Sequence, residues 1–514
     1  MKRIILVLSL VALLSSCSIY KKYSRPEEIS TKNLYGEAER TTDTITMADV
    51  TWRDFFVDEH LRGYIEQGLK NNIDMRLAAE RIYQAELALQ TAKLSFRPSF
   101  NFEPTVGVGF NSPFTYSLPV KASWEIDIMA RNINNLRRAQ ANLEYTSLYR
   151  RSVQTALVAS IANGYYTLLM LDAQLRVTRS TAASWKENVR TMRAMKEAGM
   201  TNAASISQTE ANSCSIDASV YDLEYKLVKA QNSFALLLGV TPQDFPRGEL
   251  NGVDYKDELF IGVPAQLLSR RPDVQQAEYE LKFAFYNTNI AHADLYPSLT
   301  ISAEAALKGN PATWVLSIAG KLFQPIFNAG RNRANYKIAQ SQQREALMNF
   351  QHKLLEAGNE VHTALAQCNA SRSKTELRIR QIENLEKAVY STRQLMSHSE
   401  ATYLEVLTSQ QSLLSARLQQ IADRFDGIQG VINLYRALGG GIEHIQDPNP
   451  ENGQLFNKKN SAKDKESKRT EKEAKVKSEK VKKSKKEKSE NLESDMPSVA
   501  QELAEIQQAE TTKK

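Results

Sequence analysis

The side chains that most often carry chemistry are scattered through this 514-residue sequence rather than clustered. The six histidines form no His-Glu-x-x-His pattern and no Cys/His cluster at zinc-ligand spacing. Cys214 and Cys368 are too few for a disulfide framework and are expected to pack as small apolar side chains on helices. The triplet Gly439–Gly441 closes a predicted helix and follows no strand, so it indicates a helix end rather than a phosphate loop. The sequence therefore predicts no enzyme, no metal site and no cofactor.

A third cysteine has a context of its own, because a short basic start and an apolar run over residues 4–14 precede it. The run is too short to cross a bilayer, so residues 1–16 are predicted to be an export signal. Cys17 follows Leu-Ser-Ser, which resembles a bacterial lipobox; the alternative is an ordinary signal peptide with a chance cysteine. We expect an acylated Cys17 and a lipid-anchored segment over residues 17–60. Ser18 is not the usual inner-membrane retention residue, Asp, so the outer membrane is the expected destination.

The placement of proline indicates where long helices can form. No proline occurs between Pro119 and Pro242, or between Pro325 and Pro448. Both stretches are rich in strong helix formers and contain one plausible turn near the middle. They predict two pairs of long helices, over residues 129–238 and 328–438. Unbroken helices of this length, up to about 100 Å, are typical of coiled coils.

A further helix and a strand hairpin are predicted ahead of each long helix pair. The two helices, about 73–96 and 273–295, both stop just before a proline. The apolar side chains then change from a period of 3.6 to a period of two, over residues 99–126 and 298–323. Strict alternation of this length predicts strands, so each segment is expected to form a β-hairpin.

The same elements occur twice in the same order. At a shift of 200 residues, Arg-Asn at 131–132 aligns with Arg-Asn at 331–332. Helix, proline, hairpin, two long helices and glycine in one order indicate an internal duplication. We expect a first repeat over residues 61–260, with an equatorial segment at its end, and a second over 261–441. The predicted class is an α+β membrane protein with two transmembrane hairpins and a long helical coiled-coil tunnel per chain.

Four strands cannot stand alone in a membrane, because open sheet edges cannot face lipid. Each predicted strand has about the length of a tilted bilayer-crossing strand, ~9 to 11 residues. Two chains would give eight strands and a filled interior, whereas three would give twelve strands and room for a lumen. The smallest duct is therefore a homotrimer in which a 12-stranded barrel continues as an α-barrel. The alternative is a non-channel coiled-coil lipoprotein whose hairpins cap its helices.

Five blocks of the sequence are specific: LSRRPDV at 268–274, residues 291–298 ending in Pro-Ser, FQPIFNAGR at 323–331, YLEVL at 403–407 and LYRALGGG at 434–441. In these blocks the chain resembles the TolC-like outer-membrane factors, especially the lipoprotein branch found in RND-type tripartite efflux systems. The resemblance covers residues 52–441 and implies a homotrimer with a periplasmic helical tunnel. It also implies passive efflux of drugs or other small toxic compounds, with a periplasmic adaptor (membrane fusion) protein at the tip and an inner-membrane RND-type pump. The alternative is a duct for a protein or peptide secretion system.

The predicted helix tips depart from the family pattern. The family commonly has Gly-x-x-Asp-Tyr-Leu-Glu-Val-Leu at the second tip, where this sequence has Ser399 and Thr402 in place of Gly and Asp. The first tip keeps Gly199. A carboxylate ring there would select cations by its field, and Glu197 and Glu400 are the only nearby acids. We hypothesise that Glu400 lines a constriction; the alternative is a solvated glutamate at a helix end.

The formal net charge of +7 comes from one segment. Residues 457–490 have 15 Lys and Arg against 7 Asp and Glu, a net +8, so the remaining chain has a net charge of −1. This distribution gives no support for a nucleic-acid-binding fold. The tail over residues 442–514 is Lys-, Glu- and Ser-rich and is expected to be disordered. It is either a solvated extension or, if periplasmic as the family topology implies, a segment that binds peptidoglycan.

Overall fold

The computed structural model describes residues 22–32, 34–35, 46–109, 112–250, 261, 264–309, 313–324, 328–397 and 402–441. All of these residues belong to one compact unit that spans residues 1–443. None of the helices in these ranges is both long enough and apolar enough to cross a bilayer.

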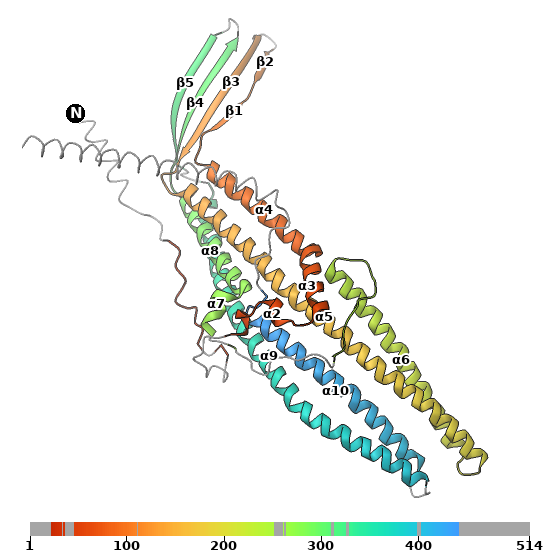
Figure 1. The fold of residues 1–514 in the computed structure, drawn as a ribbon. Helices are drawn as coiled ribbons and strands as arrows, with labels where there is room; N and C mark the ends of the chain where they lie inside the picture. Colours follow the sequence, from red (N-terminus) through yellow and green to blue (C-terminus); the bar gives the residue numbers. More distant parts are fainter. Residues whose placement is uncertain are drawn as a thin grey trace, which may run out of the picture. The chain divides into compact units, whose positions relative to one another are not determined.

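Two series of helices and strands follow one another along this unit (Figure 1). The first series comprises η2 (Met47–Asp49), α2 (Trp52–Phe55), α3 (Glu59–Asn71), α4 (Ile73–Leu94), β1 (Ser99–Phe102), β2 (Thr105–Gly109), β3 (Ser112–Ile126), α5 (Arg131–Glu197) and α6 (Ala203–Leu238). The second comprises η4 (Pro264–Gln266), α7 (Leu267–Arg270), α8 (Pro272–Ala293), β4 (Ser298–Gly309), β5 (Thr313–Phe323), α9 (Arg331–Ser397) and α10 (Tyr403–Ala437). The long-helix and hairpin predictions agree with these elements.

The two longest helices, α5 and α9, have 67 residues each. At about 1.5 Å per residue, each is about 100 Å long. The ends of α5 have clear local causes. The carboxylate of Asp127 accepts hydrogen bonds from the amides of Asn132 (3.0 Å) and Ile133 (2.8 Å) at the start. Gly199, with φ +73°, follows the last turn, because a left-handed residue at this place closes a helix at little cost.

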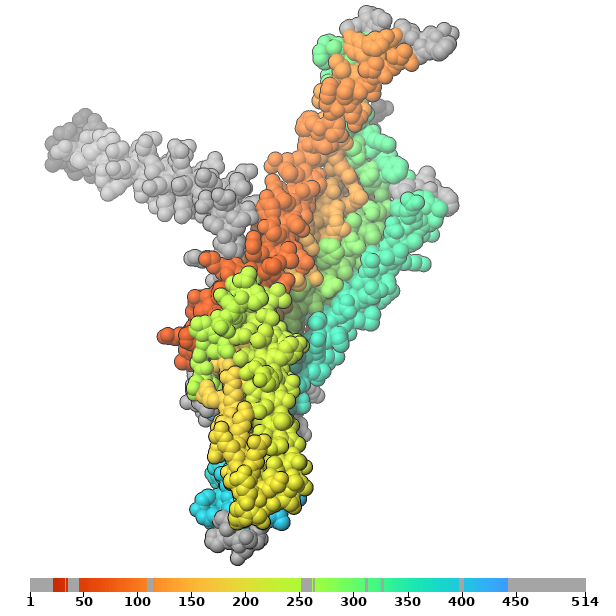
Figure 2. Space-filling model, turned by 90° about the vertical axis from the view of Figure 1, so that its right-hand side faces the viewer, coloured from red at the N-terminus to blue at the C-terminus, as the bar shows by residue number. Residues whose placement is uncertain are grey.

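The helices pack side by side in a single layer. Near the sheet the order is α4, α5, α8 and α9, and at the far end it is α6, α5, α10 and α9. One edge of the layer is therefore formed by α4 followed by α6, which Figure 2 shows one after the other, and the opposite edge by α9. The buried apolar stripe of α9 includes Ala339, Ala346, Phe350 and Leu354, at spacings of seven, four and four residues that keep side chains on one face.

The strands form one antiparallel sheet in the order β1/β2, β3, β4 and β5. Over residues 99–126, where a hairpin of two strands was expected, the structure has three strands. Both β1 and β2 pair with β3, and the break between them lies at Pro104, since the Glu103 amide still donates a hydrogen bond of 3.4 Å to the Pro119 carbonyl oxygen. Proline has no amide hydrogen to donate, so a strand that contains it is easily interrupted.

Three helix predictions need correction. α4 ends at Leu94 and α8 at Ala293, each two residues before the predicted end. α3 begins at Glu59, in a region where no helix was expected. It packs against α5 and α6, and its Tyr64 ring lies 5.3 Å from Phe234. Its buried residues Leu61, Ile65 and Gly68 follow helical spacing, a short pattern that sequence inspection missed.

The N-terminal residues 22–32 and 34–35 are packed against the second series of helices. The Tyr23 ring lies edge-on to Phe285 of α8 at 5.7 Å, and Arg25 forms a bidentate ion pair with Glu278. Farther along, Leu34 rests on α9 at Gly358, where an added Cβ would lie 2.6 Å from the Leu34 carbonyl oxygen. We call this segment the strap.

Candidate functional site

Apolar and polar side chains of the sheet lie on opposite faces. The strand register places Phe102, Val120, Ala305 and Leu316 side by side in one row across the sheet. The neighbouring apolar rows contain Phe100, Ala122, Ala303 and Ile318, and then Trp124, Ile301 and Gly320. Many of these side chains are exposed, including Phe100 (70%) and Leu316 (77%). A continuous apolar face left open to this extent marks a surface for lipid or another protein.

The other face carries charged and hydroxyl side chains. Lys121 and Glu304 are direct neighbours across β3 and β4, and the Lys121 Nζ lies 2.8 Å from the carboxylate of Glu103. Ser123 and Ser302 form the next pair in the same direction. A sheet with one apolar and one hydrated face can separate lipid from water.

The start of α5 brings an arginine to one side of the helix layer. Arg138 donates a hydrogen bond of 3.0 Å to the side-chain oxygen of Asn287, and its guanidinium lies 5.7 Å from the Phe283 ring centroid. Both partners lie on the side of α8 opposite to Glu278 and Phe285, which hold the strap. Burial lowers the pKa of Arg138. Inspection of the sequence could not find this site, because the two hydrogen-bonded residues are 149 positions apart.

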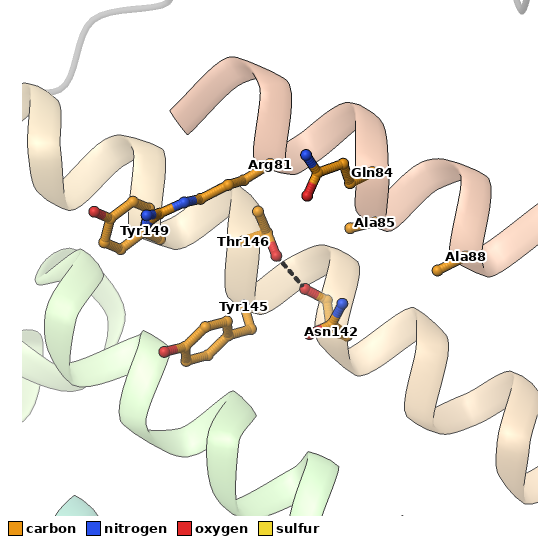
Figure 3. A pocket seen from close by; sticks show the side chains of 8 residues that line it. All are labelled: Arg81, Gln84, Ala85, Ala88, Asn142, Tyr145, Thr146 and Tyr149. Atoms are coloured by element: carbon orange, nitrogen blue, oxygen red, sulfur yellow. Dashed lines mark hydrogen bonds between the residues drawn. The ribbon is translucent and has the colours of Figure 1, made fainter. Parts of the chain in front are cut away.

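A groove of about 310 Å³ continues this side of the layer between α4 and α5 (Figure 3). Its α5 wall contains Asn142, Tyr145 and Tyr149, which follow Arg138 at steps of four, three and four residues and so share its face. From α4, the Arg81 guanidinium lies 5.0 Å from the Tyr149 ring centroid, as Figure 3 shows. The lining contains aromatic rings, amides and a guanidinium but no carboxylate.

Near the far end of the layer, the two long helix pairs pack together. Trp185 of α5, Ile216 of α6 and Leu407 of α10 belong to one buried cluster. Beside it the side-chain amides of Asn188 and Gln410, a mostly buried residue of α10, lie 2.9 Å apart in a hydrogen bond. These contacts fix α10 against α5 close to both helix tips. Sequence inspection missed this pair, which is 222 residues apart.

The predicted tip residues are only partly within the described ranges. Glu197 is the exposed last residue of α5, and Gly199 makes the turn after it. The Thr402 hydroxyl, at the start of α10, lies 3.2 Å from the Glu405 carboxylate. Ser399 and Glu400 lie outside the described residues, as does Cys17. Over the ranges described, no group of three or more His, Cys, Asp or Glu side chains could hold a metal ion.

A buried arginine joins the start of α8 and the end of α10 to the middle of α9. Arg271, with 8% of its side chain exposed, forms ion pairs with Asp273 (2.5 Å) and Glu360 (2.7 Å) and donates a hydrogen bond to the Ala437 carbonyl (3.2 Å). Burial alone would raise the pKa of Asp273, but the hydrogen bonds and charge of Arg271 outweigh it and hold that pKa below its usual range.

Comparison with known sequences identifies the family of this chain. The profile of the outer membrane efflux protein family matches residues 64–240 and 263–440. The chain belongs to this family. The profile of the prokaryotic membrane lipoprotein lipid attachment site matches residues 1–18, which include Cys17.

This chain matches two relatives over almost the whole of their length. One is the antibiotic efflux pump outer membrane protein ArpC of Pseudomonas putida, 30% identical over 464 residues, which are 84% of this chain and 93% of ArpC. The other is the probable outer membrane lipoprotein SilC of Salmonella typhimurium, 27% identical over 455 residues, which are 85% of this chain and 98% of SilC. This outer membrane efflux protein is therefore a lipid-anchored protein of the outer membrane.

The fold agrees with this assignment. A crystal structure of CusC superposes with a TM-score of 0.71 at 25% identity and covers 82% of this chain and all of the CusC chain. Membership of the family, the location and the efflux role agree with the sequence prediction.

Proposed function

We propose that three copies of this chain join edge to edge into a passive duct through the outer membrane. The observation that carries the proposal is that the sheet and the helix layer have matching open edges. β1/β2 and α4 lie at one edge of the chain, and β5 and α9 lie at the other. The same neighbour can therefore extend the sheet and the helix layer at once. Three such contacts would close a 12-stranded barrel over a helical tunnel, with no sheet edge facing lipid.

Exposed apolar side chains on the helix edges support this closure. Met348 and Leu355 of α9 are 58% and 57% exposed and lie on the side opposite to its buried stripe. On the other edge, Tyr221 and Tyr225 of α6 are 72% and 70% exposed. An isolated chain would leave this apolar surface in water, whereas a neighbouring copy would cover it.

The strap indicates which face of the layer is outside. A segment tethered to lipid through Cys17 cannot run inside a closed barrel, so the α8 face that holds Tyr23 and Arg25 is the outer face. Arg138 and the groove with Tyr145 and Tyr149 then face the lumen. Aromatic and amide side chains without carboxylates suit small organic compounds, the class of the antibiotics for which the ArpC efflux pump is named. A duct for secreted proteins or peptides remains the second candidate.

Conductance in a planar lipid bilayer tests the duct. The purified full chain is expected to give stepwise single-channel currents. The double variant Met348→Glu/Leu355→Glu should lose both the assembly and the currents, because it places charges at the copy interface. Asn349→Glu, on the same helix but outside this exposed stripe, serves as the control. Currents of normal size from the double variant in its monomeric form would refute the edge-to-edge duct.

Partners follow from the same proposal. The tips of α5–α6 and α9–α10 would dock a periplasmic adaptor protein, and an inner-membrane RND-type pump would supply the energy. Co-purification from crosslinked membranes identifies both proteins. In this arrangement Glu400 lines the tip constriction. If Glu400→Ala leaves the conductance and the cation preference unchanged, this assignment is wrong.

Two proposals concern the chain ends. Acylation of Cys17 would anchor the strap, so Cys17→Ala should lack the lipid adduct in a mass spectrum while carbonate-washed outer membranes retain the protein through its sheet. The basic tail over residues 442–514 would bind peptidoglycan. Undiminished co-sedimentation with purified peptidoglycan after deletion of the tail would dispose of that role.

A further inference from the structure

The four helix ends that adjoin the sheet contain no acidic residue. α4 leads into β1, β3 into α5, α8 into β4, and β5 into α9. Residues 88–97, 131–143, 281–293 and 331–343, which form these ends, have no Asp or Glu. Of the cations in these ranges that make no ion pair with any residue in the described part of the chain, we group six: Lys93, Arg97, Arg137, Lys282, Arg333 and Lys337. We call these six residues the basic belt.

Helix stability does not account for the three belt cations on the long helices α5 and α9. Arg137, Arg333 and Lys337 lie in the first two turns of α5 and α9. The N-terminus of a helix carries a partial positive charge, so cations there are unfavourable and acids are preferred. Arg131, in the same turn of α5, is neutralised by Asp294 at 2.9 Å, but the belt residues have no such partner. The absence of compensating carboxylates points to an anionic partner outside the chain.

Contacts with the strap place part of the belt on the outer face. The Lys282 ammonium lies 5.9 Å from the centroid of the Tyr23 ring, which itself packs on Phe285. His292 is seven residues beyond Phe285 on the same α8 face, and its ring lies 4.9 Å from Tyr336 of α9.

Helical spacing indicates where the belt residues Arg333, Lys337 and Arg137 lie around α9 and α5. Arg333 precedes Tyr336 by three residues and Lys337 follows Arg333 by four, so both lie toward the outer side of α9. On α5, Arg137 is about 100° around the helix from Arg138, whose side chain faces the lumen. Arg137 therefore does not share the face of Arg138.

The lipid anchor at Cys17 can reach the level of the basic belt. Cys17 lies six residues before Tyr23, and six residues span at most about 20 Å. Tyr23 packs at Phe285, eight residues or about 12 Å from the end of α8. An acyl chain on Cys17 can therefore enter the bilayer beside the belt, at the base of the sheet. Lys21 and Lys22 add two more cations next to the anchor.

We propose that the basic belt binds the headgroups of anionic phospholipids, such as phosphatidylglycerol, in the periplasmic leaflet. This inference rests on the proposed insertion of the sheet in the outer membrane. Lys and Arg beside a membrane surface attract anionic headgroups, and several together give a marked preference over zwitterionic lipid. The belt and the acyl chain then act together to fix the depth of the sheet in the bilayer.

Lipid competition at a tryptophan tests the proposal. Trp124 is partly exposed at the base of the sheet, and its indole donates a hydrogen bond of 3.1 Å to the Phe96 carbonyl oxygen. Trp314→Phe removes the other exposed tryptophan of the sheet, while Trp52 and Trp185 are buried. Brominated phosphatidylcholine in the vesicles should quench the fluorescence of Trp124. Added phosphatidylglycerol should displace the brominated lipid from the protein, with an association constant relative to phosphatidylcholine of roughly 5 to 10. A concentration of 0.5 M KCl should reduce this relative constant toward 1.

Charge variants decide whether the belt is the cause. Arg137→Gln/Arg333→Gln/Lys337→Gln should bring the relative association constant close to 1. The variant Arg137→Lys/Arg333→Lys, in which Lys337 is unchanged, should retain the preference for phosphatidylglycerol. Lys196→Gln/Lys226→Gln/Lys229→Gln removes three exposed cations far from the sheet and should change nothing.

Two outcomes overturn the proposal in different ways. If brominated lipid quenches Trp124 but the triple Gln variant keeps the preference, the belt does not bind headgroups although the sheet is inserted. If brominated lipid fails to quench Trp124, the sheet does not contact lipid, and the proposed function fails with the belt.

Discussion

Arg138 of α5 and Asn287 of α8 are joined by a hydrogen bond of 3.0 Å, and this neutral amide is the only hydrogen-bond partner of Arg138 in the described ranges. The bond lies on the lumen side of the proposed duct, about 10 Å below the sheet, since Arg138 is seven residues from the start of α5. An arginine that keeps its charge without a carboxylate contributes a positive field to the pathway.

Reversal of this charge is expected to change ion selectivity. Arg138→Glu should raise the permeability ratio of K⁺ to Cl⁻ by about two-fold or more, because the copies would together carry a ring of negative charge. The reversal potential in a KCl gradient measures the ratio. Arg190→Glu, at a position 79% exposed and far down α5, is the control and should leave the ratio unchanged. An equal shift in both variants would show that Arg138 does not face the lumen.

The ion pair between Arg271 and Asp273 gives the helix layer a defined acid sensitivity. The folded-state pKa of Asp273 lies below its usual value, so this carboxylate stabilises the fold above the unfolded pKa of about 3.9. That stability is lost as the pH falls through the folded pKa. Asp273→Asn should lower the stability at pH 7 by about 1 to 3 kcal/mol. The apparent melting temperature from helical circular dichroism should differ between the variant and the wild type at pH 7, and the difference should shrink at pH 3. A difference that grows at pH 3 would contradict the assigned pKa direction.

Strand-to-helix links in both halves contain an alanine in a left-handed conformation. Ala130 has φ +55° and Ala329 has φ +54°. An L-residue pays about 1 to 2 kcal/mol for this conformation, whereas glycine adopts it freely. Ala130→Gly should therefore raise the thermal stability, by about 1 kcal/mol after the greater freedom of glycine in the unfolded chain is subtracted. Ala139→Gly, inside the same helix, should lower it by about 1 kcal/mol. Destabilisation by both substitutions would refute the strain at Ala130.

The contact between Asn188 and Gln410 near the tips is expected to restrain the two helix pairs. Gln410→Ala removes a hydrogen bond of 2.9 Å that links α10 to α5, so the tips should separate more often and the mean conductance should rise. Gln419→Ala changes an exposed residue of the same helix and serves as the control. Unchanged open probability in Gln410→Ala would mean that the buried cluster around Trp185 alone holds the tips.

Local features of the sequence were sufficient to predict the long helices and hairpins. Three of these features depend only on residues close together in the sequence. They are the absence of proline, the alternation that places Phe100 and Phe102 on one face, and the glycine after α5. Pro104 shows the limit of such reasoning, because alternation continued through it while the backbone pairing did not. The lumen pair of Arg138 and Asn287 was beyond prediction, since it depends on which helices become neighbours. The tip contact of Asn188 with Gln410 was hidden for the same reason.

The mass of the detergent-extracted assembly tests the central claim most directly. Native mass spectrometry of the full-length lipidated chain should give a particle of three copies, because three sets of strands close a barrel with room for a lumen. A particle of one or two copies that still carries the lipid and the native helix content would contradict the duct proposed here.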